Sequence, residues 1–248
     1  MNSTPDKTTT TQIKALVFDV FGTLVDWRTG IAAQAKALLS NDFNLDWNLF
    51  ADAWRAQYQP SMQRIRGGEI AFCTLDTLHM INLNQVIKDF NLEGIKEQTK
   101  QNLNHAWHTL GGWSDTQDAL HRIRKHFLIA PCSNGNISLM IYLARHNHIH
   151  WDAILGAEIA GNYKPHPIVY QRSVETLGLK PSEVMMVAAH SSDLEAARAQ
   201  GLKTAFVRRP FEYGPVGSPN HHLAETAALF SVDFSAKDLN DLADQLGA

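Results

Sequence analysis

The chain has 248 residues, of which 44% are apolar and 19% charged, and it carries a net charge of −3 with a pI of about 6.4. This composition supports a sizeable core, and the lack of a basic block argues against a nucleic-acid or anionic-membrane partner. No stretch approaches the ~20 apolar residues that span a bilayer, and Cys73 and Cys132 are too few for a disulfide framework, so we predict a cytoplasmic protein with a small-molecule partner.

The first predicted element is a buried strand in the run IKALVFDVFGTLVD. Its apolar residues are consecutive and do not alternate with polar ones, as in a strand that is covered on both faces. Asp19 ends this strand, and a turn through Gly22 and Thr23 follows. The sequence therefore places one carboxylate at the carboxyl end of a buried strand.

The segment 28–106 has a helical pattern, with Ile31, Ala35 and Leu39 at helical spacing and no convincing buried strand. We interpret it as a helical cap domain inserted after the first strand, with residues 1–27 and 107–248 forming the core. A cap at this point would lie over the carboxyl end of the sheet, where it can enclose a small substrate and exclude water.

From Ser114 onward, predicted helices and strands alternate. Ser114 and Gln117 predict a capping box for a helix that leads into the strand FLIAPC. Further strands are predicted at 153–160, 184–189 and 203–207, and helices are predicted from Pro167 to Gly178, from Ser192 to Gly201 and in the C-terminal run SAKDLNDLADQL. This alternation predicts an α/β fold with a doubly wound, Rossmann-like parallel sheet, whose ligands bind at the carboxyl ends of the strands.

Four polar residues, Asp19, Ser133, Lys164 and Asp193, are each predicted at or just past the end of a strand. Asp19 is the candidate nucleophile, which Thr23 and the backbone amides of the turn would hold ionised. Lys164 would keep the pKa of Asp19 low by its charge. Taken singly, Asp19 could be a carboxylate that caps its own turn and Lys164 a surface lysine.

These positions resemble the layout of the haloacid-dehalogenase-like superfamily. Phosphatases of that superfamily typically carry a second Asp, a general acid, where this chain has Phe21, and an acidic pair where it has AAHSSD. The missing acids leave a divalent cation short of oxygen ligands, so we expect no metal and no other cofactor. Asp193 is then free to act as a base or to orient a water molecule.

The resemblance is more specific to the type II L-2-haloacid dehalogenases and covers nearly the whole chain. It implies that Arg55 in the WR pair of the cap receives the departing halide, that Ser133 and Asn134 bind the substrate, and that Tyr170 supports Lys164. Typical members have Ser, Asn and an aromatic residue where this chain has Ala188, His190 and Ser192. His190 could replace the Asn beside the water, or add a titratable group.

Two sets of residues summarise the predicted site. The predicted catalytic residues are Asp19, Thr23, Arg55, Ser133, Asn134, Lys164, Tyr170, His190 and Asp193. The predicted substrate-binding residues are Val20, Phe21, Trp27, Arg55, Tyr58, Ser133 and Asn134.

The resemblance implies hydrolysis of short L-2-haloalkanoic acids to D-2-hydroxy acids through an ester of Asp19. It also implies a homodimer formed through the cap. Three alternatives stay open: the same displacement on fluoroacetate or azetidine-2-carboxylate, with His190 as proton donor to an amine; a Mg²⁺-dependent phosphatase; and a non-catalytic binding protein on the same fold.

Overall fold

The computed structural model describes residues 13–248; residues 1–12, which we assigned to the core domain, lie outside the described residues. Its centre is a six-stranded sheet in the order β3-β2-β1-β4-β5-β6, with every neighbouring pair parallel. The strands are β1 (Ala15–Phe18), β2 (Leu128–Ser133), β3 (Leu155–Gly156), β4 (Val184–Ala188), β5 (Lys203–Val207) and β6 (Phe234–Ala236). The predicted doubly wound parallel sheet is therefore confirmed.

Helices cover both faces of the sheet, so alternate residues of a strand are buried on opposite sides. Leu16 and Phe18 of β1 belong to a core shared with α7 (Thr116–Ile123), α8 (Ile137–His146) and α12 (Leu239–Leu246). Ala15 and Val17 belong to a second core, shared with α10 (Pro167–Leu177) and α11 (Ser191–Ala199). The continuous apolar runs of the strands are thus explained by burial on both faces.

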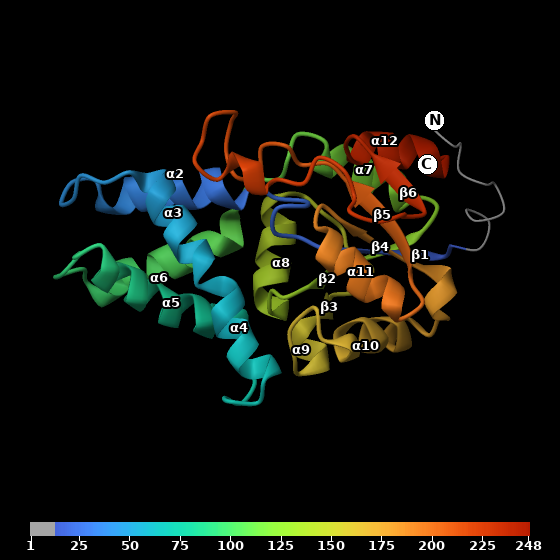
Figure 1. Cartoon of the computed structure of the whole chain (residues 1–248), viewed down its shortest axis with the longest axis horizontal. Coiled ribbons are helices and arrows are strands. Elements are labelled where there is room, and N and C mark those ends of the chain that lie inside the picture. Colours follow the sequence, from blue (N-terminus) through green and yellow to red (C-terminus); the bar gives the residue numbers. More distant parts are fainter. Residues whose placement is uncertain (1–12) are drawn as a thin grey trace.

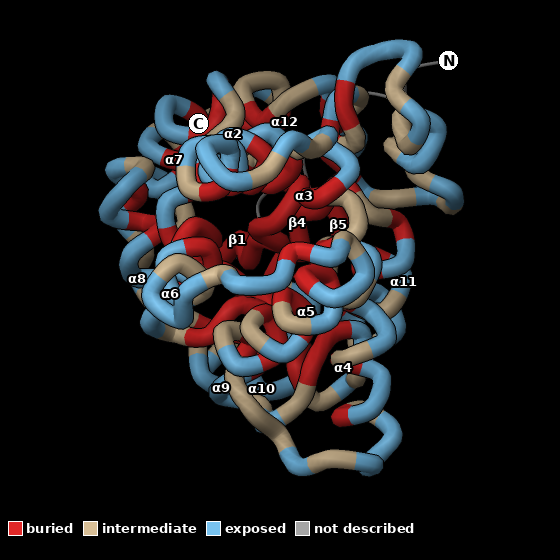
Figure 2. Tube along the Cα trace, turned by 90° about the vertical axis from the view of Figure 1, so that its left-hand side faces the viewer, coloured by how far each residue is buried: buried red, intermediate tan, exposed pale blue. Residues whose placement is uncertain are grey.

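A second group of helices lies between β1 and α7 in the sequence and forms one end of the molecule (Figure 1). It comprises α2 (Trp27–Leu39), α3 (Trp47–Ala56), α4 (Tyr58–Arg66), α5 (Leu75–Asp89) and α6 (Glu97–His105), followed by the 3₁₀ turn η1 (Ala106–Thr109). Figure 2 looks onto this end and shows buried segments on the inner sides of the helices, with exposed segments outside. The helical prediction for 28–106 is confirmed, while the domain boundaries stay a prediction.

Two local predictions are wrong. Only Leu155 and Gly156 of the predicted strand 153–160 form β3, and α9 (Ala157–Ala160) begins directly after them. Gly156 has a φ of +123°, and a Cβ atom there would lie 2.1 Å from the carbonyl oxygen of Ser133, so the chain turns where β3 packs closely on β2. The capping box is absent as well: α7 begins at Thr116, after Asp115, without a side-chain capping bond from the described residues.

The other predicted helices are confirmed. Helix α10 begins at Pro167 and ends before Gly178, which takes the left-handed conformation with a φ of +65°. Helix α12 buries Leu239, Leu242 and Leu246 on one side. The remaining elements are the 3₁₀ turns η2 (Pro181–Glu183) and η3 (His221–Leu223). Within residues 13–248, no helix is both long and apolar enough to cross a membrane.

Candidate active site

Asp19 lies directly after β1, at the carboxyl edge of the sheet. Its backbone N–H donates to the carbonyl of Val187 in β4 (3.0 Å), which extends the strand pairing up to the carboxylate. Thr23 Oγ1 donates to Asp19 Oδ2 (2.8 Å) and accepts from the backbone N–H of Ala189 (2.9 Å). The turn through Gly22 therefore fixes the carboxylate in place, and the side chain of Asp19 is only 11% exposed.

Lys164 lies between two buried carboxylates. Its Nζ donates to Asp19 Oδ1 (2.9 Å) and to Asp193 Oδ2 (2.5 Å), and the Tyr170 hydroxyl donates to the other oxygen of Asp193 (2.5 Å). The backbone N–H of Lys164 donates to Asn134 Oδ1 (2.8 Å), which joins this group to the end of β2. The structure thus brings together residues that follow β1, β2 and β4 with Lys164 and Tyr170 from the connection between β3 and β4, as the strand-end positions predicted.

The charges of this group set its protonation. Burial opposes ionisation of Asp19, but the charge of Lys164 and the hydrogen bond from His190 outweigh it and hold the pKa of Asp19 well below its usual value. Burial likewise opposes the charge of Lys164, yet Asp19 and Asp193 raise its pKa above the usual value. Asp19 is therefore a desolvated, ionised carboxylate at neutral pH.

Arg55, at the end of α3, is held by aromatic rings. Its guanidinium carbon lies 4.1 Å from the ring centroid of Tyr58 and 5.3 Å from that of Trp27, within the range of cation–π contact. Burial lowers the pKa of Arg55, but Tyr58 and Tyr213 among other groups raise it, with a net increase. Its Nη1 is buried and has no hydrogen-bond partner among residues 13–248, so it is available to an anion.

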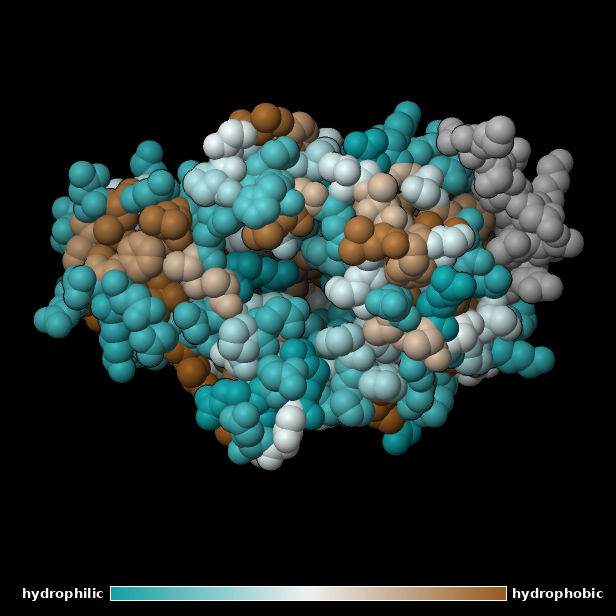
Figure 3. All heavy atoms as spheres, in the orientation of Figure 1, coloured by the Kyte–Doolittle hydropathy of each residue, from teal (hydrophilic) through white to brown (hydrophobic). Residues whose placement is uncertain are grey.

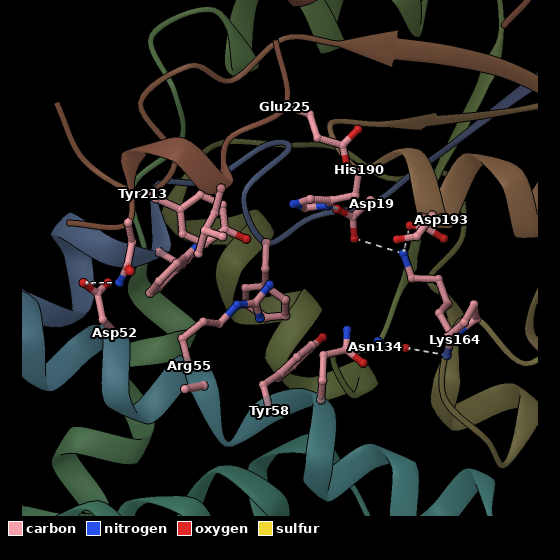
Figure 4. Close-up of a pocket in the computed structure, with 18 residues that line it drawn as sticks. Asp19, Asp52, Arg55, Tyr58, Asn134, Lys164, His190, Asp193, Tyr213 and Glu225 are labelled. Carbon is pink, nitrogen blue, oxygen red and sulfur yellow. Dashed lines mark hydrogen bonds and ion pairs between the residues drawn. The ribbon is translucent and has the colours of Figure 1, made fainter. Parts of the chain in front are cut away.

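A cavity of about 520 Å³ joins these groups. Figure 3 shows a hollow, bordered by hydrophilic residues, between the helical end and the rest of the molecule. The cavity is lined by Asp19, Phe21, Trp27, Asp52, Arg55, Ala56, Tyr58, Gln59, Asn134, Lys164, Pro165, His190, Ser192, Asp193, Tyr213, Asn220, Leu223 and Glu225. In Figure 4, Arg55 and Tyr58 extend toward it from the helical end, while Asp19, Lys164 and Asp193 lie together on the opposite side.

Four predicted site residues do not line the cavity. Thr23 and Tyr170 act on Asp19 and Asp193 through the hydrogen bonds above. Ser133 is fully buried, and its Oγ accepts from the backbone N–H of Gly135 (3.0 Å). Val20 is buried, and its carbonyl closes the turn after β1. These four residues therefore hold the loops that carry the site, and the structure shows no contact of Ser133 or Val20 with the cavity.

His190 connects Asp19 to Glu212, which sequence reasoning did not identify. Its Nδ1 lies 3.0 Å from Asp19 Oδ2, and its Nε2 lies 3.0 and 3.1 Å from the two oxygens of Glu212. Glu212 is buried and also accepts from Trp27 Nε1 (3.1 Å). Burial opposes the charge of His190, but Glu212 and Asp19 raise its pKa well above the usual value, so it is an imidazolium between two carboxylates.

The long connection 208–233 between β5 and β6 carries further cavity residues that were not predicted: Tyr213, Asn220, Leu223 and Glu225. Asn220 donates to Asp52 Oδ2 of α3 (3.1 Å), and Asp52 in turn pairs with Arg28 of α2 (2.6 Å). Glu225 accepts from the backbone N–H of Ser191 at the start of α11 (3.0 Å). The connection is thus bound both to the helical end and to the core.

Gly22 is required by the position of Glu212. A Cβ atom at residue 22 would lie 2.1 Å from Glu212 Oε1, and the φ of Gly22 is +90°. We expect Gly22→Ala to lower the free energy of unfolding by more than the ~1 kcal/mol that a positive φ alone costs. Thermal unfolding of both variants would test this against Gly161→Ala, where φ is +65° but no atom of the described residues lies within 4 Å. Equal losses would show that Glu212 is not constrained.

The side chains of the described residues form no arrangement typical of a metal site. Within residues 13–248, no group of three or more His, Cys, Asp or Glu side chains is arranged to hold a metal ion. The ammonium of Lys164 lies between Asp19 and Asp193, the two carboxylates that would otherwise be the nearest oxygen ligands.

Comparisons with known proteins agree with this architecture. Residues 13–201 match the model of the haloacid dehalogenase-like hydrolases. The chain is 30% identical to (S)-2-haloacid dehalogenase 1 of Pseudomonas sp. (strain CBS-3), an alignment that covers 88% of this chain and 95% of that protein. Because the model matches most of the chain, this protein belongs to the haloacid dehalogenase-like hydrolase family.

Solved structures extend the similarity over nearly the whole chain. The defluorinating L-2-haloacid dehalogenase Rha0230 is 44% identical, with a TM-score of 0.89 and coverage of 95% of this chain and 96% of that one. The L-2-haloacid dehalogenase PA0810 is 43% identical, with a TM-score of 0.88 and coverage of 95% and 99%.

Proposed function

We infer that this protein hydrolyses short 2-haloalkanoic acids to 2-hydroxy acids. The observation that carries the inference is an ionised, desolvated Asp19 in the same cavity as the buried Nη1 of Arg55, which has no partner among the described residues. Displacement of halide from carbon needs a nucleophile, a role that an ionised carboxylate can fill, and it is assisted by a cation that accepts the departing anion. Membership of the family and similarity to proteins named 2-haloacid dehalogenases support the same chemistry.

The first step is an SN2 displacement. An oxygen of Asp19 forms a bond to C2 of the substrate while the carbon–halide bond breaks, and the halide leaves toward Arg55 with the bonding electrons. Asn134 and Arg55 bind the substrate carboxylate and the halide region. The configuration at C2 inverts once, so an L-2-haloacid gives a D-2-hydroxy acid.

The second step is hydrolysis of the Asp19 ester. Water attacks the carboxyl carbon of Asp19, the bond from that carbon to the substrate oxygen breaks, and the hydroxy acid leaves. Lys164, Asp193 and His190 surround the ester and position this water. Attack at the protein carbon regenerates the ionised Asp19 for the next turnover.

Phosphate chemistry is disfavoured by Phe21. Its ring packs edge-on against Trp107 with the centroids 5.7 Å apart, and it has no proton to donate to a leaving alcohol. Halide needs no such proton. We propose a metal-independent reaction, because Lys164 supplies the positive charge beside Asp19.

Defluorination of fluoroacetate is the second candidate, since the structure of Rha0230, at 44% identity, is described as that of a defluorinating enzyme. Ring opening of azetidine-2-carboxylate has less support. Both ring nitrogens of His190 already bond to carboxylates, and an in-line displacement places the leaving group on the side of C2 away from Asp19.

The test is halide release from L- and D-2-chloropropionate with excess EDTA. We expect chelator-resistant release from the L form only. A single turnover in ¹⁸O-labelled water should leave the label in Asp19, and label found only in the product would contradict the ester mechanism. Absence of halide release from these acids and from fluoroacetate would favour a phosphatase, tested with Mg²⁺ and a generic phosphate ester, or a non-catalytic binding protein.

The homodimer, the cytoplasmic location and the domain boundaries stay predictions from the sequence.

A further inference from the structure

His190 contacts Asp19 on one side and has a second buried carboxylate, Glu212, behind it. Asp193, for which the sequence allowed a role as a base or as a group that orients water, accepts a short hydrogen bond on each oxygen, from Lys164 and from Tyr170. Those bonds fit a residue that positions Lys164 better than one that receives a proton from water. His190 instead aligns Nδ1 with Asp19 and Nε2 with Glu212.

We propose that His190, held in orientation by Glu212, is the general base for hydrolysis of the Asp19 ester, and that formation of the ester is what frees it to act. The proposal rests on the proposed function, because it requires the ester intermediate. His190 is then a catalytic residue, and Glu212 a positioning residue that acts through it.

The timing follows from the charges around His190. In the free enzyme it faces the carboxylates of Asp19 and Glu212, with Lys164 bound to Asp19. Asp193 lies beyond Lys164, and Arg55, Arg209 and the hydroxyl of Tyr213 also act on these carboxylates. Formation of the ester removes the charge of Asp19, while the charges of Lys164, Arg55 and Arg209 remain. The imidazolium loses one of its two anionic partners, and its Nδ1 proton becomes easier to release.

The protons balance over the cycle. After displacement, His190 loses the Nδ1 proton to the solvent of the cavity and keeps the Nε2 proton on Glu212. Nδ1 then takes a proton from the attacking water as its oxygen bonds to the carboxyl carbon of Asp19. When the tetrahedral intermediate collapses, His190 returns that proton to the departing alkoxide. The remaining proton of the water, now on the Asp19 carboxyl group, passes to Nδ1 and restores the starting state.

The orientation of His190 is built into the fold. It precedes α11, at the end of the loop after β4, whereas Glu212 comes from the connection after β5. Trp27 donates to Glu212, and Gly22 leaves the space that Glu212 fills. Three separate segments of the chain therefore place the carboxylate of Glu212 behind the imidazole of His190, beside the nucleophile Asp19.

The experiment separates the two chemical steps by rapid quench with L-2-chloropropionate. Chloride release reports displacement, and D-lactate release and intact-protein mass report hydrolysis. We expect His190→Asn to retain a chloride burst, accumulate the ester and hydrolyse it about 10²-fold more slowly, and Glu212→Gln to show the same pattern with a smaller loss. His121→Asn, an exposed histidine on α7, is the matched control.

The wild-type enzyme gives a test that does not depend on any variant. The rate of ester hydrolysis should rise with pH to a plateau, and His190→Asn should remove this dependence. Hydrolysis that slows as pH rises would assign His190 as a hydrogen-bond donor and overturn the proposal, as would unchanged hydrolysis in His190→Asn. Absence of a chloride burst in the wild type would instead contradict the proposed function, so the two failures are distinguishable.

Discussion

Asp19→Asn is expected to reduce chloride release from L-2-chloropropionate by at least about 10⁴-fold. The amide keeps the shape of the side chain, and its single oxygen can still accept from Thr23 or from Lys164, which bond to different oxygens of Asp19, but it lacks the charge that attacks C2. Neither neighbouring carboxylate can replace it, because Asp193 is bound on both oxygens and Glu212 lies behind His190. Initial rates of chloride release, measured with EDTA present, would show the loss.

The matched control is Asp118→Asn, an exposed carboxylate in the first turn of α7, which should leave the rate unchanged. Circular dichroism of both variants would show whether the fold is retained. Residual activity of the Asp19→Asn variant within about tenfold of the wild type, in a sample that mass spectrometry shows to be free of deamidation, would contradict the role of Asp19.

The central part of the site could be predicted because sequence position and spatial position coincide there. Asp19, Lys164 and Asp193 each follow a buried strand or its connection, and parallel strands bring such positions to one edge. The structure places Lys164 Nζ within 2.9 Å of Asp19 and 2.5 Å of Asp193. The resemblance to known dehalogenases added Arg55 and Tyr170, which no periodicity identifies.

Glu212 could not be predicted in the same way. It lies in the connection 208–233, which has no hydrophobic period, and its partners His190 and Trp27 are distant in the sequence. A carboxylate in such a loop is solvated in most proteins. The available signal was indirect: His190, which is partly buried beside the nucleophile, requires an anionic partner to remain charged.

The local errors in the fold have a similar origin. The run 153–160 is apolar apart from Glu158, a pattern that does not distinguish a buried strand from a short buried helix. The turn at Gly156 is imposed by its close packing on Ser133, a contact between residues far apart in the sequence. The local sequence pattern therefore predicted most helices and strands, but it failed at Gly156, where a tertiary contact ends the strand early.

The ion pairs of the site also link activity to pH. The pKa of Asp19 in the folded protein is below its unfolded value of about 3.9, so its contribution to stability is present above that pH and is lost as pH falls through the folded pKa. The pKa of His190 is raised, so its contribution is present below about 6.5 and is lost as pH rises through the folded pKa. In the wild type, Asp19 therefore does not limit activity in mild acid.

Lys164→Met is expected to reduce chloride release by about 10³-fold and to make the activity fall at a higher pH than in the wild type. The substitution leaves two buried carboxylates without the cation that pairs with both, and loss of one partner of a buried ion pair destabilises a protein by about 3–5 kcal/mol. Burial raises the pKa of Asp19, and without the charge of Lys164 less remains to lower it. The pKa of Asp19 therefore rises, and the acid limb of the pH–rate profile moves to higher pH.

Denaturant unfolding and the pH dependence of chloride release would measure both effects, with Lys36→Met on the exposed side of α2 as the control. The two readouts separate the possible roles of Lys164. A stability loss with an unchanged acid limb would mean that Lys164 supports the fold without controlling the ionisation of Asp19. A shift of the acid limb of the pH–rate profile means that the charge of Lys164 controls the ionisation of Asp19. The other hydrogen-bond partners of Asp19, His190 and Thr23, remain in the variant and cannot account for such a shift.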